Sequence, residues 1–240
     1  NNKDFNYDRN TKFIYTKSKS IGKKRNIAVI AAKTRFLAFI DSDAFPKKNW
    51  IESSIKYLKI KNIGIVSGPN INPLKQTFFE KLIELVKNSF LITMKPGFQR
   101  GYIKKEQYIK FLPSVNWILS KKIFNLNGGM NSKMLRNEDW DFVFKLRKKN
   151  FKIFYSPKTV VFHKSGSISH FILKRFKYGY YMWDILNKPN SENYYFYIPL
   201  LFCFFLTTLP VVIFSSLYLY IYLSVFSIFL IIVLIETIRV

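Results

Sequence analysis

The chain has 240 residues, enough for one domain of ordinary size with an appendage. Its 39 Lys and Arg against 14 Asp and Glu give a formal net charge of +25, which favours polyanionic partners such as nucleic acid, anionic lipid or phosphorylated substrates. Hydrophobic residues make up 49% of the chain, which excludes a disordered basic tail, and its one cysteine and two histidines exclude a disulfide framework and cysteine- or histidine-rich metal sites.

Residues 1–163 alternate between short apolar runs and segments with helical periodicity. The runs at 36–40, 63–68, 115–120 and 152–155 predict strands, and the periodic segments predict helices starting at Pro46 and spanning 78–90 and 137–149. Strands that alternate with helices indicate an α/β fold with a mostly parallel sheet. Residues 91–114 are expected to form a long irregular connection, of the kind that often carries function or flexibility.

Residues 164–190 combine basic and aromatic side chains. The apolar residues at helical spacing are Phe171, Ile172, Phe176 and Tyr180, and the basic residues between them are Lys174, Arg175 and Lys177. This composition is typical of a helix that lies in a membrane interface. A core-packed amphipathic helix and a nucleic-acid-binding segment are the alternatives. We expect no nucleic-acid partner, because an apolar tail follows.

Residues 191–240 form that tail, and 193–235 hold no charged side chain. As a helix, these 43 residues would extend ~65 Å, about twice the hydrocarbon thickness of a bilayer. Two transmembrane helices fit better, at about 196–214 and 217–235, with the break at 207–210 or 215–216. The alternative is a buried helical hairpin of a soluble protein. Basic residues precede the first span and Arg239 follows the second, which predicts that both ends lie in the cytoplasm.

Asp41 and Asp43 form the first acidic cluster, at the end of the predicted strand 36–40. Open α/β sheets bind ligands at the carboxyl ends of their strands, and carboxylate oxygens suit Mg²⁺ or Mn²⁺ bridging to a phosphate. The alternative is a turn in which an aspartate caps the following helix.

Glu138, Asp139 and Asp141 form the second acidic cluster, at the start of the predicted helix 137–149. Glu138 and Asp141 are three residues apart and share a helix face, whereas Asp139 points elsewhere. Ordinary interaction with the helix dipole is the alternative reading. Gly128 and Gly129 precede the cluster and permit a tight bend close to a ligand.

In their order, these motifs resemble those of the family-2 glycosyltransferases, especially the membrane-associated transferases of bacterial exopolysaccharide and cell-envelope synthesis. The similar segments are Gly22-Lys-Lys-Arg25-Asn26, the D-x-D strand and following residues 36–51, the Gly-Gly and Glu-Asp motifs within 126–147, the strand pair 151–163 ending in His163, and the basic aromatic segment 175–179. The resemblance covers about residues 15–185.

The resemblance implies a GT-A fold, Rossmann-like, over residues 1–163, and inverting, metal-dependent transfer of a sugar from a nucleotide diphosphate sugar. It implies that Asp43, with His163, holds Mg²⁺ or Mn²⁺, and that Asp41 contacts the nucleotide or assists at the metal. It further implies that Arg25 and Asn26 line the nucleotide site. Asp139 would be the general base, with Glu138 beside it, and Gly128, Gly129 and Trp140 would contact the acceptor. The acceptor would be a glycan or a polyprenyl-linked glycan at the cytoplasmic face of the inner membrane, with membrane lipid as a further partner.

One departure concerns the N-terminus. The family begins with nucleoside-binding strands roughly 40–50 residues before the Arg-Asn segment, by its usual layout, whereas 24 residues precede Arg25 here. We therefore expect this chain to bind nucleotide sugars poorly; titration of a nucleotide-sugar panel with Mn²⁺ tests this, and tight binding would refute it.

Three other classes of protein remain open. A haloacid-dehalogenase-type phosphatase also places D-x-D after an apolar strand, but Phe45 stands where that class has Thr or Val. A non-catalytic membrane scaffold or remnant would tolerate loss of the acids. A membrane-tethered nucleic-acid binder would show steep salt dependence on duplex DNA.

Overall fold

The computed structural model describes residues 11–89, 103–186 and 197–239. Ten helical or strand elements precede α5 in the described part: α1 (Ile21–Ala31), β1 (Phe36–Ile40), β2 (Ala44–Pro46), α2 (Trp50–Ile55), the 3₁₀ helix η1 (Lys56–Lys59), β3 (Ile63–Ser67), β4 (Asn70–Ile71), α3 (Phe78–Asn88), β5 (Gln107–Ile109) and β6 (Asn116–Ser120). They are followed by α5 (Lys121–Leu126), α6 (Glu138–Lys148), β7 (Lys152–Tyr155), β8 (Val161–His163), α7 (Ile168–Tyr180), α8 (Trp183–Leu186), α9 (Tyr197–Thr207), η3 (Leu209–Phe214) and α10 (Ser216–Arg239).

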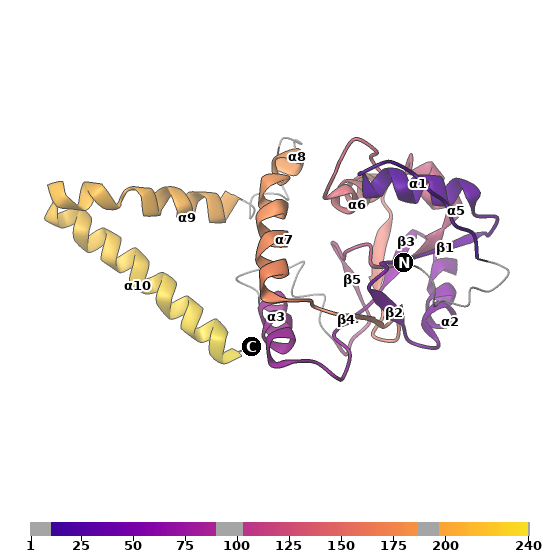
Figure 1. Cartoon of the computed structure of the whole chain (residues 1–240), viewed down its shortest axis with the longest axis horizontal. Coiled ribbons are helices and arrows are strands. Elements are labelled where there is room, and N and C mark those ends of the chain that lie inside the picture. Colours follow the sequence, from indigo (N-terminus) through magenta and orange to yellow (C-terminus); the bar gives the residue numbers. More distant parts are fainter. Residues whose placement is uncertain (1–10, 90–102, 187–196, 240) are drawn as a thin grey trace.

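The larger sheet has five strands in the order β1-β6-β3-β7-β5. Helices α1, α5 and α6 lie along one side of this sheet and α2 along the other (Figure 1). Side chains of β6 alternate accordingly: Trp117 and Leu119 belong to the core under α1 and α6, whereas Ile118 packs with Trp50 of α2. Both faces are therefore covered, and the class is α/β as expected.

The pairing of the strands differs from the mostly parallel sheet that the sequence predicts. Only β3 and β7 run parallel in the larger sheet, because β6 lies between β1 and β3 and is antiparallel to both, and β5 is antiparallel to β7. The alternation of strands and helices gave the class correctly but not the directions. Strand β6 follows β3 by about 50 residues in the chain but lies between β1 and β3 in the sheet. Its own residues carry no local signal of this position.

The smaller sheet has the order β2-β8-β4 and positions the first acidic cluster. Strand β2 pairs with β8 in the register Ala44↔His163, so Asp43 comes next to His163. The prediction that a helix starts at Pro46 is wrong, because Pro46 ends β2 and α2 starts at Trp50. Pro46 has no backbone N–H, and the edge of a small sheet tolerates that loss.

Asn116 joins the two sheets and is fully buried. Its Oδ1 accepts the indole N–H of Trp50 at 2.7 Å, and its Nδ2 donates to the carbonyls of Thr159 at 2.8 Å and Pro69 at 3.3 Å. One side chain thus satisfies groups from α2 and from the segments that precede β4 and β8.

Replacing Asn116 with alanine is expected to lower the free energy of unfolding by about 3–5 kcal/mol, because it removes the partner of the buried Trp50 indole N–H and of the Thr159 carbonyl, whereas the Pro69 carbonyl still accepts the N–H of Val161. Denaturant unfolding in detergent measures this, with Asn125→Ala on the exposed side of α5 as the control. A loss below about 1 kcal/mol would contradict the role assigned to Asn116.

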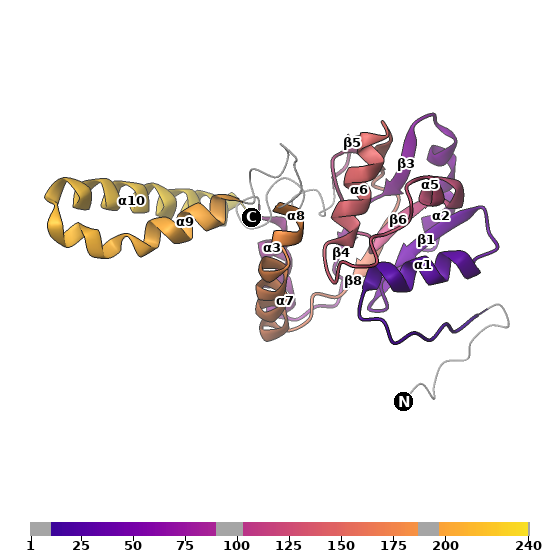
Figure 2. The same cartoon turned by 90° about the horizontal axis from the view of Figure 1, so that it is seen from above.

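Helix α7 contributes no buried residue, so the alternative of a core-packed helix for 168–180 is wrong. It lies beside α3, between the α/β domain and the C-terminal helices (Figures 1 and 2). Helix α3 starts with a complete capping box between Thr77 and Glu80, which fixes its first turn. Of the expected connection 91–114, residues 90–102 lie outside the described residues, and 107–109 form β5.

Within the described residues of the apolar tail, 197–239, one helix is long and apolar enough to cross a membrane: α10, with 24 residues. The predicted first span, 196–214, is not one helix: α9 has 11 residues and is followed by the 3₁₀ helix η3, with Pro210 in its first turn. The chain breaks at both positions considered, after Thr207 and at Ser215. Contacts between the rings of Phe202 and Phe229 and of Phe205 and Tyr222 nevertheless pack α9 against α10 as an antiparallel pair.

Candidate active site

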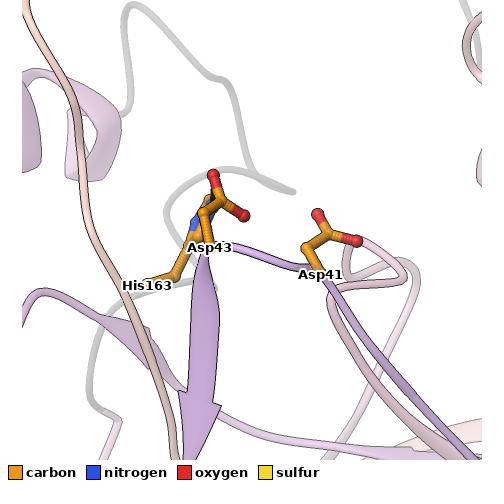
Figure 3. Close-up of side chains that lie close together, drawn as sticks. All are labelled: Asp41, Asp43 and His163. Carbon is orange, nitrogen blue, oxygen red and sulfur yellow. Dashed lines mark ion pairs between the residues drawn. The ribbon is translucent and has the colours of Figure 1, made fainter. Parts of the chain in front are cut away.

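The first acidic cluster gains a histidine from a distant part of the chain (Figure 3). Asp41 follows β1, Asp43 precedes β2 and His163 ends β8. The Nε2 atom of His163 lies 3.2 Å from Oδ2 of Asp43, and one ligand atom from each of the three residues lies within 4.8 Å of the others. Two carboxylates and an imidazole at this spacing can hold a divalent cation such as Mg²⁺ or Mn²⁺.

The protonation states of this cluster suit metal binding. Burial lowers the pKa of His163, and the charges of Lys87 and Lys174 add to this effect, so the neighbouring Asp43 only partly compensates. Burial also opposes ionisation of Asp43, yet its interactions with His163 and its own backbone N–H bring its pKa below the ordinary value. At neutral pH the cluster therefore offers a neutral imidazole and an ionised carboxylate, the forms that bind metal.

The second acidic cluster occupies the first turn of α6. Asn137, with φ of 62°, turns the chain into the helix, and its side-chain amide donates to the carbonyl of Tyr181 at 3.1 Å. Glu138 and Asp141 are buried on the shared face that the spacing predicts, whereas Asp139 is half-exposed. Asp139 is consequently the member of the cluster that a ligand can reach.

Arg25 connects the two acidic clusters. Its guanidinium lies 3.0 Å from Oδ1 of Asp41 and 3.1 Å from Oε1 of Glu138, and it donates to Oγ of Ser114 at 2.5 Å. Its side chain is only 14% exposed. The candidate metal ligands and the Glu-Asp motif, about 100 residues apart in the chain, therefore belong to one site. The sequence assigned Arg25 to the nucleotide site, and in the structure it lies between carboxylates.

Glu138 has the most strongly displaced pKa of the site. Burial, followed by the charge of Asp139, raises the pKa of Glu138 to about 7, and the attraction of Arg25 only partly offsets this. A general base is expected to have a pKa near working pH. The structure gives that property to the buried neighbour.

This raised pKa has a consequence for stability. Between pH about 4.5 and about 7, folded Glu138 retains a proton that the unfolded chain has lost, so the free energy of unfolding falls as pH rises through this window. We expect the free energy of unfolding of the unmodified protein to fall by about 1–3 kcal/mol across this window, and we expect Glu138→Gln to remove that fall. Unfolding of the unmodified protein and of the variant at pH 5, 6, 7 and 8 measures this. Parallel pH profiles for the two proteins would contradict it.

The Gly-Gly turn lies against α1. Gly128 and Gly129 have φ of 82° and 69°, a region that disfavours other residues, and a Cβ on Gly129 would come within 2.9 Å of Oδ1 of Asn26. The Asn26 amide both donates to the Met130 carbonyl at 2.8 Å and accepts its N–H at 2.9 Å. Asn26 thus holds the turn in place, and its contact with a nucleotide stays a prediction.

Trp140 stacks on the buried ring of Phe111, with centroids 3.8 Å apart and planes 11° apart. Its backbone N–H donates to Oδ1 of Asp139 at 2.9 Å. The backbone of Trp140 thus contacts the neighbouring carboxylate while its indole packs on Phe111, and its predicted acceptor contact stays a prediction, like those of Gly128 and Gly129.

Sequence reasoning missed three residues of this site: Ser114, Lys87 and Lys174. Ser114 binds Arg25 from the loop before β6, and no pattern in the sequence distinguishes it from other serines. Lys87 donates to Oγ of Ser165 at 3.0 Å, and it acts on the charge of His163 together with Lys174 of α7. Their basic charge was visible in the sequence, but their proximity to the acidic pair depends on the fold.

Residues 2–126 match the model of the family described as Glycosyl transferase family 2. The chain belongs to this family. As a family-2 chain with helices on both faces of a mixed sheet, it has the GT-A-like α/β fold that the motifs implied. The family match ends before the Gly-Gly and Glu-Asp motifs, whose place in the site comes from the geometry above.

Two curated relatives of this family-2 chain, each named "Pre-mycofactocin glycosyltransferase" and each from a strain of Mycobacterium tuberculosis, are 23% identical to it over 146 residues. The alignment covers 61% of this chain and 30% of each relative, so the chain spans under a third of their length.

Solved structures also resemble the family-2 chain. GalNAc-T7 with UDP, GalNAc and Mn²⁺ is 11% identical, with a TM-score of 0.43 over 60% of this chain and 30% of that one. S. aureus TarS 1-349 is 15% identical, with a TM-score of 0.39 over 73% of this chain and 48% of that one. A longer S. aureus TarS structure is 16% identical, with a TM-score of 0.41 over 75% and 30%.

Proposed function

We propose that this chain transfers a sugar from a nucleotide diphosphate sugar to a glycan or polyprenyl-linked acceptor, with inversion at the anomeric carbon. The observation that carries the proposal is the Arg25 bridge, which brings Asp41 and Glu138 into one site. Sugar transfer requires neutralisation of the leaving diphosphate and a base for the acceptor hydroxyl. The two clusters provide candidates for both tasks.

The residues that would hold the cation are Asp43 and His163, with Asp41 assisting. Their hard oxygen and imidazole ligands fit Mg²⁺ or Mn²⁺. When bound, the metal would neutralise the charge of the leaving diphosphate. Lys87 and Lys174 add positive charge on the same side of the site.

Asp139 is the proposed base. It is half-exposed at the start of α6, whereas Glu138 is buried against Arg25 and unable to meet an acceptor directly. The Asp139 carboxylate would accept the hydroxyl proton as the acceptor oxygen bonds to the anomeric carbon and the bond to the diphosphate breaks. Glu138 would tune this step through its charge, which is coupled to that of Asp139.

The proposed location is the cytoplasmic face of the inner membrane, with membrane lipid as a partner. Its support is α10, which has the length and composition of a membrane-crossing helix, and the excess of basic residues in the domain before it. A polyprenyl-linked acceptor would be confined to the same surface.

The proposal is tested by assaying sugar transfer or donor hydrolysis with a panel of nucleotide sugars at millimolar concentration and saturating Mn²⁺, so that weak donor binding does not hide turnover. Asp139→Asn should lower the rate by about 10²–10⁴-fold, since it removes the base. Its Mn²⁺ affinity should be unchanged. Glu52→Gln, an exposed acid on α2, is the control. Turnover that survives in Asp139→Asn would refute the assigned base, and a biological role that survives both Asp139→Asn and Asp43→Asn would favour the non-catalytic scaffold.

A further inference from the structure

The helices α3 and α7 carry an exposed apolar surface that takes no part in the site. On α3, Phe78, Phe79 and Leu82 are 76%, 54% and 42% exposed, and the two phenylalanine rings contact each other edge to face. On α7 and α8 the exposed apolar residues are Ile172, Leu173, Phe176, Tyr180 and Trp183. We refer to these eight residues as the α3–α7 ridge.

The ridge is not buried when the chain folds. Ile172, Phe176 and Tyr180 recur every four residues on one stripe of α7, and none of them is buried. Helix α3 directs Ile83 and Glu80 inward and leaves its phenylalanines outside. The two helices are neighbours (Figures 1 and 2), and Phe79 of α3 lines one hollow together with Ile168, which lies four residues before Ile172 on the same stripe of α7. A contiguous apolar patch on a folded domain marks a contact surface.

The charge around the ridge narrows the class of partner. The basic residues of α3, α7 and the turn before α7 are Lys81, Lys87, Lys164, Lys174, Arg175 and Lys177, against the acids Glu80 and Glu84. Both acids are already engaged, Glu80 with Lys164 at 3.3 Å and Glu84 with the backbone N–H of Asn72 at 3.1 Å. Aromatic and aliphatic side chains flanked by lysines fit an anionic bilayer surface.

The ridge also has the right position for a bilayer. Helix α7 runs across the direction of α9 and α10 in both views, as a helix lying in the membrane plane would if those helices cross it. The end of α10 comes close to α3 in the same views. The bond from Asn137 to the carbonyl of Tyr181 ties the end of α7 to the first turn of α6, and so links the ridge to the Glu-Asp motif.

We infer that the α3–α7 ridge rests on the surface of an anionic bilayer, with α3 as a second contact supplied by the α/β domain itself. The inference rests on the membrane location in the proposed function. It adds that the domain is held by two helices, so that the acidic site keeps a fixed height above the lipid. One helix alone would let the domain pivot about its axis.

The test uses the full chain in a Cys203→Ser background, with single cysteines that carry an environment-sensitive fluorophore. Leu82→Cys reports on α3 and Ile172→Cys on α7. The matched control is Ile51→Cys on α2, since Ile51 is 48% exposed and helix α2 lies at the far side of the domain from α7. The probe is a nanodisc of phosphatidylcholine and phosphatidylglycerol, prepared with and without brominated acyl chains. We expect bromine quenching and a blue shift at positions 82 and 172, and neither at position 51.

Quenching at 172 without quenching at 82 would overturn the role of α3, and quenching at neither would overturn the ridge as a lipid contact. Disulfide cross-linking between copies of the unlabelled Leu82→Cys protein, together with no quenching of the labelled one, would assign the ridge to a second copy of the chain and overturn the inference equally. As a second variant, Phe79→Ser with Leu82→Ser should reduce the quenching of a label at position 172 by at least half. The Mn²⁺ affinity of this variant should be unchanged. Failure of sugar transfer with quenching intact would count against the proposed function and not against the ridge.

Discussion

Asp43→Asn is expected to weaken Mn²⁺ binding by about 100-fold or more. It replaces a charged ligand with a neutral amide, and even residues that only support a ligand change metal affinity by about 10–100-fold. Asp43 is 63% exposed at its side chain, so the substitution should leave the fold intact. Titration calorimetry with Mn²⁺ measures the change, and Asp184→Asn, an exposed acid on α8, serves as the control.

The same variant has a second readout that does not depend on turnover. Asp43 is the influence that raises the pKa of His163 against burial, so Asp43→Asn should move the His163 titration to still lower pH. Proton NMR of the imidazole measures this shift in the absence of metal. Unchanged Mn²⁺ affinity together with an unchanged His163 titration would show that the contact of 3.2 Å between the two side chains has no functional meaning.

Arg25→Ala is expected to be the most damaging single change at the site. It leaves the buried carboxylate of Glu138 and the carboxylate of Asp41 without their shared cation, and the loss of one partner from a buried pair costs about 3–5 kcal/mol. The loss should be larger at pH 8 than at pH 6, because protonation of Glu138 at lower pH removes the unpaired charge. Mn²⁺ affinity should also fall by about 10-fold or more, since Asp41 loses the group that orients it.

Unfolding at the two pH values and Mn²⁺ titration measure these effects. Arg35→Ala is the control, because the Arg35 side chain is exposed and, among the described residues, contacts the ring of Phe36; its backbone bond to Lys121 is kept in the variant. Arg25→Lys should recover only part of the loss, since one ammonium cannot span the positions that the planar guanidinium reaches. An Arg25→Ala protein whose stability loss is equal at pH 6 and pH 8 would disprove the coupling of Arg25 to Glu138.

Local patterns in the sequence located several elements closely. The predicted strands 36–40 and 152–155 coincide with β1 and β7, and the predicted helix 137–149 differs from α6 by one residue at each end. These segments combine a clear apolar period with polar or glycine boundaries, so their own residues determine them. The short strands β2 and β8 are different, because they depend on pairing with distant segments, β2 with β8 and β8 with both β2 and β4, and because Pro46 suggested a helix start.

The sequence predicted the acidic residues of the site but not the contacts that join them. The spacing of Asp41 and Asp43 and of Glu138 and Asp139 marked both acidic clusters as candidates. That Arg25 joins them depends on α1 packing beside α6, a contact between segments more than 100 residues apart. Likewise, the raised pKa of Glu138 arises from burial that the fold creates. The sequence alone does not show whether Glu138 or Asp139 has the raised pKa.

The unequal legs of the apolar tail constrain how it can sit in lipid. With a rise of 1.5 Å in α9 and 2.0 Å in η3, the first leg reaches about 28 Å, close to the ~30 Å hydrocarbon thickness, whereas α10 extends about 36 Å. If both legs cross the same bilayer, α10 must incline or project beyond the acyl chains to remove the mismatch. Figure 1 shows α10 oblique to α9, and the Glu236–Arg239 pair near its end would then reach the headgroups. In that arrangement, the length of the first leg, which includes the 3₁₀ helix at Pro210, would set the tilt of α10.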